Sequence, residues 1–333
     1  MGPGGSDAGT IFKLLPSGGQ PTHLHTFSGG TDDGASPYGA LMQATDGNLY
    51  GTTSLGGAFN AGTVFRITTA GAFTLLHSFI PSVEGTGSVA ALVPSGDGNF
   101  VGIMPSEGSG GMGTVFKVSP TGNFTVLYTF RASNAEGDNP AAALLQATDG
   151  NFYGTTALGG DSGVGTVFKM TPSGSVTLLH SFTGGTDGKS PLAPLMQASD
   201  GTLYGTTSLG ASGAGTVFKF TPAGQFAIIY TVPSDRGVGP VGQVVEGRDG
   251  NLYVTTQGAA PNFGTIFRLA PDGTATASAR WLGELDRNCT CPVSSDASFA
   301  IPALIAVAKL QLGLVVCSGS GEPTIDEPGV IRR

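Results

Sequence analysis

The stretch DGNLYGTTSLGGAFNAGTVF, at positions 46–65, decides the fold of this chain because close copies of it return at a regular distance. The copies are DGNFYGTTALGGDSGVGTVF at 149–168 and DGTLYGTTSLGASGAGTVF at 200–218. The tetrad G-T-[V/I]-F recurs with spacings of 53, 51, 52, 50 and 49 residues, starting at Gly9, Gly62, Gly113, Gly165, Gly215 and Gly264. A fixed step of this length indicates a tandem-repeat architecture.

Each repeat predicts four short strands, named here A to D. Strand A is an apolar run such as ALMQA at 40–44, and an Asp-Gly pair follows it. Asp-Gly between apolar runs is a strong signal for a tight hairpin, because glycine accepts a positive φ. Strands B, C and D follow as NLYGTT, TVFRI and TLLHSF in the first full repeat. Four antiparallel strands every fifty residues are typical of a blade of a β-propeller, an all-β fold.

The repeats predict the domain organisation. A partial unit at 9–27 supplies strands C and D, and five units follow it up to residue 281, so the repeat domain spans 1–281 and has six expected blades. The remaining residues, 282–333, form an atypical tail. Its apolar run at 301–316 is a candidate for closing strands. A truncated gene product or an unrelated tail is the competing interpretation, so closure of the ring stays open.

Composition excludes several classes of protein. Charged residues make up only 11% of the 333 residues, and the net charge is −8, which argues against a nucleic-acid partner. No uncharged apolar stretch reaches 18 residues, so no membrane span is expected, and the N-terminus does not resemble a signal peptide. All three cysteines lie in the tail, at 289, 291 and 317, which excludes a disulfide framework in the repeats.

Sequence variation is concentrated in the B–C and D–A loops, which are long, whereas the A–B and C–D turns are short. In a propeller the two long loops share one face, and loops on a rigid scaffold are the usual place for binding. An acidic residue recurs in the D–A loops, and the candidate ligand-face acids are Asp33, Glu84, Glu136, Asp187 and Asp235. Such acids could bind Ca²⁺ or a cationic partner, or simply cap a glycine-rich bend. No other cofactor is expected.

Three further positions recur in register. Strand A ends in residues that are candidates for lining a channel, namely Gln43, Gln146, Gln197 and Glu246. The strand C phenylalanine of each unit is expected to pack between blades rather than to stack on a carbohydrate. The basic residue after it is expected to pair with the turn aspartate rather than to form an anion-binding ring; the pairs are Arg66–Asp46, Lys117–Asp97, Lys169–Asp149, Lys219–Asp200 and Arg268–Asp249.

Histidine occurs at one phase of strand D, at His25, His77 and His180, where other units carry tyrosine. A catalytic base would not be replaced by tyrosine in neighbouring copies, so these histidines are interpreted as structural.

The motifs DGNLYGTTSLGG, GTVFK and TLLHSF resemble those of the GloVer tandem repeat, a bacterial repeat family, over residues 9–281. The resemblance implies an extracellular or cell-surface protein and no defined activity. The D-G-N-L-Y pattern is also similar to the blades of streptogramin lyases, whose loop histidine has no counterpart in the loops here.

Two functions follow as hypotheses. The first is a non-enzymatic, monomeric propeller that binds a glycan or protein ligand through its variable loops. The alternative is a propeller lyase or hydrolase that uses the carboxylates of the D–A loops.

Overall fold

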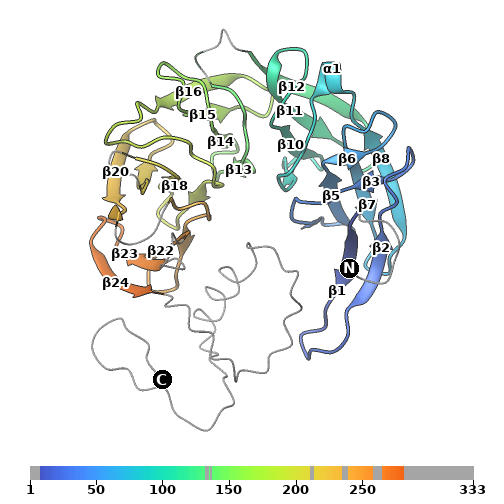
Figure 1. The fold of residues 1–333 in the computed structure, drawn as a ribbon, viewed down its shortest axis with the longest axis horizontal. Coiled ribbons are helices and arrows are strands. Elements are labelled where there is room, and N and C mark those ends of the chain that lie inside the picture. Colours follow the sequence, from blue (N-terminus) through green and yellow to red (C-terminus); the bar gives the residue numbers. More distant parts are fainter. Residues whose placement is uncertain are drawn as a thin grey trace. The chain divides into compact units, whose positions relative to one another are not determined.

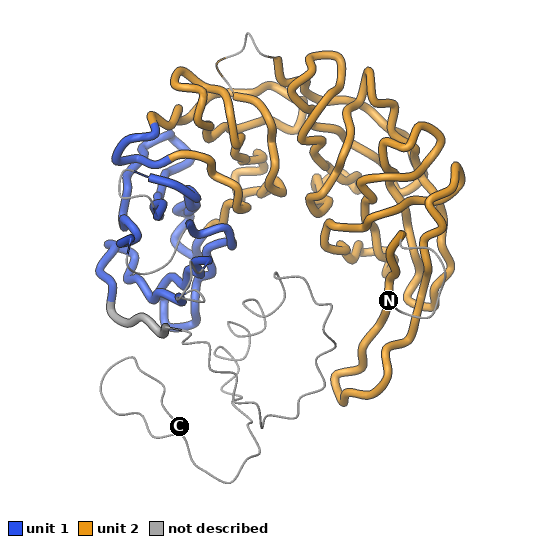
Figure 2. The backbone as a smooth tube through the Cα atoms, in the orientation of Figure 1, with its two compact units in different colours: residues 1, 184–188, 198–333 blue, residues 2–183, 189–197 orange. Residues whose placement is uncertain are grey.

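The computed structural model describes residues 8–131, 135, 137–210, 214–234, 239–257 and 265–280. The predicted tail at 282–333 and two of the candidate acids, Glu136 and Asp235, lie outside these residues. The chain divides into two compact units, one at 2–183 and 189–197 and the other at 184–188 and 198–333 (Figure 2).

The larger unit consists of antiparallel sheets that follow one another along the chain (Figure 1). Its first strands form a two-stranded hairpin, β1 (Thr10–Lys13) and β2 (Thr22–Thr26), and a short pair, β3 (Gly34–Ala35) and β6 (Leu55–Gly56). The first four-stranded sheet contains β4 (Met42–Gln43), β5 (Leu49–Thr53), β7 (Thr63–Ile67) and β8 (Phe73–Ser78). The next contains β9 (Val93–Pro94), β10 (Phe100–Met104), β11 (Gly111–Val118) and β12 (Phe124–Arg131). The third contains β13 (Leu145–Gln146), β14 (Phe152–Thr156), β15 (Thr166–Met170) and β16 (Val176–Ser181), and β17 (Met196–Gln197) ends the unit.

The smaller unit repeats the same plan. Strands β18 (Leu203–Thr207), β19 (Thr216–Phe220) and β20 (Phe226–Thr231) run antiparallel in this order. They are followed by a four-stranded sheet of β21 (Val245–Glu246), β22 (Leu252–Thr256), β23 (Thr265–Leu269) and β24 (Ala275–Arg280). The prediction of an all-β protein made of four-stranded antiparallel sheets is therefore confirmed.

The one α-helix among the described residues is the single turn α1 (Pro81–Glu84), in a D–A loop. No helix in the described part of the chain is therefore long and apolar enough to span a bilayer.

Strand A is shorter than predicted. The apolar run at 40–44 forms only the two-residue strand β4, and the runs at 143–147 and 194–198 likewise give two-residue strands. The chain before β4 contains Pro37 and Gly39, and a Cβ on Gly39 would lie 2.7 Å from the carbonyl oxygen of Ala90. Gly39 therefore lies against the next D–A loop, whereas Pro37 lies against Gly9 of the preceding unit, and neither residue joins the sheet.

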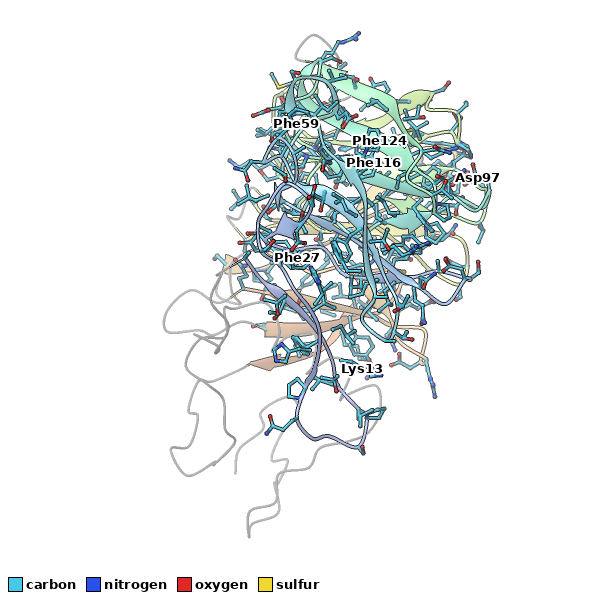
Figure 3. The ribbon with its side chains drawn as sticks, turned by 90° about the vertical axis from the view of Figure 1, so that its right-hand side faces the viewer. Lys13, Phe27, Phe59, Asp97, Phe116 and Phe124 are labelled. Carbon is cyan, nitrogen blue, oxygen red and sulfur yellow. The ribbon has the colours of Figure 1, made fainter. Side chains whose placement is uncertain are left out.

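The strand C phenylalanine fills the space over strand B. Phe65, Phe116, Phe168, Phe218 and Phe267 are almost completely buried, as expected for packing. The glycine of the LYGTT motif makes this possible, because a Cβ on Gly51 would lie 2.6 Å from the Phe65 ring. Phe116 then packs on Phe124 of β12 with ring centroids 5.1 Å apart (Figure 3). Burial of the ring excludes carbohydrate stacking at these positions.

The first repeat is the exception. Phe12 occupies the same position in β1 but is 52% exposed. Among the described residues β1 pairs only with β2, so no strand B lies beside Phe12 to cover it. The expectation that all six phenylalanines are packed is therefore wrong for Phe12.

Candidate functional site

The two faces of the sheets carry different chemistry. Figure 3 shows Phe59, in a B–C loop, and Asp97, in an A–B turn, on opposite sides of the sheets in the larger unit. The side with the B–C and D–A loops is called here the loop face, and the side with the A–B and C–D turns is the turn face.

The D–A loops are held in an unusual backbone conformation. Ser36, Asn139 and Ser190 each have a positive φ of 52–56° although they are not glycine, and each directly precedes a proline. Asn139 donates its N–H to the carbonyl of Met112 and accepts from the N–H of Ala157, which bridges two successive repeats. Strain of this kind clusters at functional sites, where the surrounding structure has to maintain it.

The predicted acid Asp33 is a capping residue. Its carboxylate accepts hydrogen bonds from the N–H and hydroxyl of Ser28, at 2.8 and 3.0 Å, and from the N–H of Gly34, at 2.8 Å. His25 Nε2 lies 3.1 Å from the same carboxylate. Burial acts to raise the pKa of Asp33, but these hydrogen bonds together outweigh it and hold the pKa below its usual value.

The predicted acid Glu84 repeats this arrangement one unit later. Its Oε2 accepts from the N–H of Ile80 at 2.9 Å and lies 2.8 Å from His77 Nε2. The imidazole stacks on Phe124 with centroids 4.1 Å apart. Asp187 has the same sequence position and lies half-buried. The acid and the strand D histidine thus fasten a D–A loop to its own sheet, and the spacing of seven or eight residues between them was a signal for this pairing in the sequence.

A different acid in a D–A loop has no such partners. Asp138 forms a backbone bridge with Leu158, and its carboxylate makes no hydrogen bond or ion pair with the described residues. Leu158 is 47% exposed and presents apolar surface beside the loop. Burial therefore raises the pKa of Asp138 above its usual value. The repeat pattern does not reveal Asp138, because this residue lies two positions after the recurring acid of its D–A loop.

The residues that end strand A connect successive repeats. Gln197 Oε1 accepts the N–H of Thr148 at 2.9 Å, and the Glu246 carboxylate accepts the N–H and hydroxyl of Ser199 at 2.8 and 2.7 Å. Gln146 lies beside Gly96, at the corresponding turn. Gln43 is exposed and donates to the carbonyl of Gly47 in its own turn. These contacts place the four residues at the A–B turns. That they line a channel stays a prediction.

The turn face carries a repeated clamp around the turn aspartate. Asp149 accepts from Asn151 Nδ2 at 2.9 Å, from the Tyr153 hydroxyl at 2.8 Å and from Lys169 Nζ at 3.2 Å. The ion pairs Lys117–Asp97, at 3.0 Å, and Arg268–Asp249, at 3.7 Å, form as predicted.

Two of the predicted ion pairs differ from this pattern. Arg66 donates to Thr74 Oγ1 at 3.4 Å and interacts with Asp46 only electrostatically. Lys219 does not bind Asp200; it donates to the carbonyl oxygen of Pro271 at 3.4 Å, so the prediction of that pair is wrong. The described residues contain no cluster of three or more His, Cys, Asp or Glu side chains that could hold a metal ion.

The sequence matches the model of the Gloeobacter/Verrucomicrobia repeat over residues 1–147 and 95–295. The chain belongs to this repeat family. The two matches overlap at 95–147 of this Gloeobacter/Verrucomicrobia repeat protein, as expected for tandem copies of one unit. No curated protein matches the sequence at a significant level.

Solved structures similar to this repeat protein include two candidate 6-phosphogluconolactonases. The one from Bacteroides fragilis is 20% identical with a TM-score of 0.55, and the match covers 84% of this chain and 79% of that one. The one from Bacteroides uniformis is 17% identical with a TM-score of 0.54, and the match covers 82% and 78%. The extracellular domain of a candidate hybrid two-component system from B. thetaiotaomicron is 12% identical with a TM-score of 0.55; the match covers 86% of this chain but only 34% of that one.

At these identities the likeness establishes the fold, a β-propeller. It also corrects the first functional hypothesis. A non-enzymatic binding protein was expected, whereas the two Bacteroides structures, matched over 79% and 78% of their own length, bear the names of candidate lactonases. The comparison favours the alternative hypothesis, a propeller hydrolase.

Proposed function

We propose that this repeat protein is a hydrolase that opens a sugar lactone, with Asp138 as its general base. The observation that carries the proposal is the environment of Asp138, a D–A loop carboxylate that is partly buried and makes no polar contact with the described residues. Perturbed carboxylates of this kind are concentrated at catalytic sites. The lactonases of similar fold supply the substrate class.

The neighbouring acids support this choice by elimination. Asp33 and Glu84 each accept hydrogen bonds from groups of the protein, so their carboxylate oxygens already have partners in the D–A loop and strand D. No described residue occupies the lone pairs of Asp138, and its raised pKa makes its carboxylate a stronger base than an ordinary aspartate.

The proposed step needs one water molecule and one carboxylate. Asp138 accepts a proton from the water molecule while the water oxygen attacks the lactone carbonyl carbon. The tetrahedral intermediate then collapses, the bond from the carbonyl carbon to the ring oxygen breaks, and the ring oxygen takes the proton from Asp138 and leaves as a hydroxyl group. The product is an open-chain sugar acid, and Asp138 returns to its starting state.

The fold of the proposed enzyme is a monomeric propeller with six blades. The six G-T-[V/I]-F strands support this number, since each belongs to one sheet or to the β1–β2 pair in the structure.

The location proposed for the enzyme is outside the cell or at its surface. The family resemblance supports this location, as does the fold likeness to a domain described as extracellular.

The test is an assay of the purified full-length chain against glucono-δ-lactone and 6-phosphogluconolactone. Acid release is measured by pH-stat titration, and buffer without protein is the blank. We expect hydrolysis above the spontaneous rate, and we expect Asp138→Asn to lower kcat/KM by about 100-fold or more, the usual contribution of a general base. The matched control is Asp161→Asn, which removes the same charge from an exposed B–C loop residue and leaves the rate unchanged.

Two results would overturn the proposal. One is a wild-type rate equal to the blank for both lactones. The other is full activity in the Asp138→Asn variant with its fold verified by circular dichroism, because the general base would then have to be another group.

A further inference from the structure

One repeat departs from the clamp on the turn face. Four repeats carry asparagine two residues after the turn aspartate, at Asn48, Asn99, Asn151 and Asn251. In three of them, those at 48, 151 and 251, the asparagine donates its side-chain N–H to that aspartate. The repeat with β18–β20 carries Thr202 instead, and only its backbone N–H reaches Asp200, at 2.8 Å. The amide that orients the carboxylate elsewhere is therefore missing.

The residue opposite Lys219 on β20 also differs from that in three other repeats. Its partner in the strand register is Ala227, and the partner of Arg268 is likewise an alanine, Ala277. The corresponding partners of Arg66, Lys117 and Lys169 are Thr74, Thr125 and Thr177. Arg66 uses its threonine as a hydrogen-bond acceptor. Ala227 has no hydroxyl group and is smaller, so it leaves space beside Lys219 and offers no side-chain acceptor. Lys219 extends instead to the carbonyl oxygen of Pro271.

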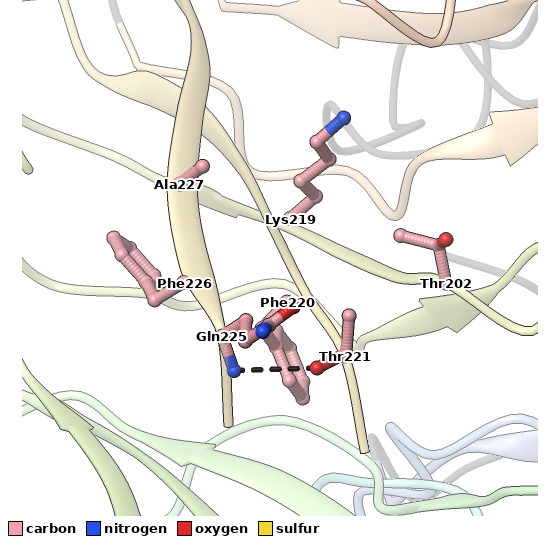
Figure 4. Close-up of a pocket in the computed structure, with 7 residues that line it drawn as sticks. All are labelled: Thr202, Lys219, Phe220, Thr221, Gln225, Phe226 and Ala227. Atoms are coloured by element: carbon pink, nitrogen blue, oxygen red, sulfur yellow. Dashed lines mark hydrogen bonds between the residues drawn. The ribbon is translucent and has the colours of Figure 1, made fainter. Parts of the chain in front are cut away.

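These changes coincide with a hollow of about 260 Å³ on the turn face (Figure 4). Besides Ala227 it is lined by Thr202, Lys219, Phe220, Thr221, Gln225 and Phe226. Its volume is just below the range of small-molecule pockets, about 300 Å³ and above, and suits a ligand of monosaccharide size. The polar groups of the lining are one ammonium group, two hydroxyl groups and one side-chain amide.

We propose that this hollow is a binding site for a sugar acid, a polyhydroxylated molecule with a single carboxylate. The ammonium group of Lys219 binds the carboxylate, and the side chains of Thr202, Thr221 and Gln225 bind hydroxyl groups.

The charges around the hollow favour one negative charge over two. Lys219 is the cation in the lining, and it also interacts electrostatically with Asp272. The chain as a whole has a net charge of −8. A phosphate dianion therefore meets more repulsion here than a carboxylate.

The experiment is isothermal titration of the full-length chain with gluconate, with glucose and inorganic phosphate as the other two ligands. We expect saturable binding of gluconate and affinities about tenfold or more weaker for both other ligands, because each lacks the carboxylate or the hydroxyl groups. Lys219→Met and Thr202→Asn should each abolish the binding. Thr202→Asn restores the residue found in the four other repeats, so it should fold normally and draw Lys219 toward Asp200.

Two control variants show whether gluconate binds at this hollow or elsewhere on the protein. Lys169→Met removes a clamped lysine at the same position of another repeat and should leave gluconate binding unchanged. Asp138→Asn should also leave it unchanged, so a failure of the proposed hydrolysis does not decide this proposal. The proposal is overturned if gluconate does not bind, if Lys219→Met and Thr202→Asn bind it like the wild type, or if phosphate binds as tightly as gluconate.

Discussion

At the scale of single residues, the partners of an aspartate decide what it can do. Asp149 is partly buried, which acts to raise its pKa, but hydrogen bonds from Asn151, Tyr153 and Lys169 lower it to about 2. Asp138 has no such partners among the residues that the structure describes, and its partial burial raises its pKa. The first carboxylate stabilises a turn, and the second has the properties of a base. Two aspartates of one repeat therefore differ in their properties because their hydrogen-bond partners differ.

The first prediction concerns the stability cost of Asp138. A raised pKa in the folded state means that the charged form is disfavoured there, so stability falls as pH rises through about 3.8, the value in the unfolded chain, toward the folded value. Asp138→Asn removes this charge. It should increase the free energy of unfolding at pH 7, by less than about 1 kcal/mol for a partly exposed group, and change it little at pH 3. Urea unfolding at both pH values measures this, and a loss of stability at pH 7 would contradict it.

At the scale of the sheet, the strand C phenylalanine determines how well a repeat is packed. Phe116 is fully buried between β10 and β12 and also contacts Phe79 of the preceding repeat, with centroids 5.4 Å apart. Phe12 has the same neighbours in sequence but lies largely exposed on β1. The motif is therefore not sufficient for burial, because the covering strand B has to be present as well.

The second prediction uses these two residues as a matched pair. Phe116→Ala should lower the free energy of unfolding by about 3–5 kcal/mol, because it leaves a cavity in a packed core. Phe12→Ala should lower it by less than about 1 kcal/mol, since most of the ring already contacts water. Urea denaturation followed by far-UV circular dichroism measures both. Equal losses for the two variants would show that Phe12 is covered in solution.

At the scale of the whole molecule, repetition multiplies weak electrostatic contributions. The pKa values of the turn aspartates Asp46, Asp97, Asp149 and Asp249 are all lowered by hydrogen bonds, with asparagine donors in each turn. A single exposed clamp contributes little. Because four copies titrate in the same direction, their contributions to the free energy of unfolding add up as the pH falls.

The third prediction is the shape of this response. A carboxylate with a lowered pKa contributes stability that is present above about pH 3.8 and lost as pH falls through the folded value, which is about 2 for Asp149. The free energy of unfolding should therefore be nearly constant between about pH 5 and 7 and fall between about pH 4 and 2. Urea midpoints across this range measure it. In Asp149→Asn the fall should be shallower, and an unchanged slope would contradict the role of the clamp.

The sequence by itself determined the repeat, the order of its strands, its tight turns and three of its ion pairs. These features depend on residues close together in the chain, such as the Asp-Gly pair at 46–47, and on their return at a fixed distance. The histidine partners of Asp33 and Glu84 were also within reach of sequence reasoning, because they lie seven or eight residues away on the neighbouring strand.

Only the tertiary structure decided which of the repeated polar residues have partners. The environment of Asp138 depends on Leu158 in a later loop, and the release of Lys219 depends on Thr202, Ala227 and the carbonyl of Pro271, up to 52 residues away. The exposure of Phe12 likewise depends on a strand that is missing beside it among the described residues. Hydrogen bonding and burial are properties of atoms brought together across repeats, so a few substitutions within a repeated motif can convert a structural clamp into a candidate binding site.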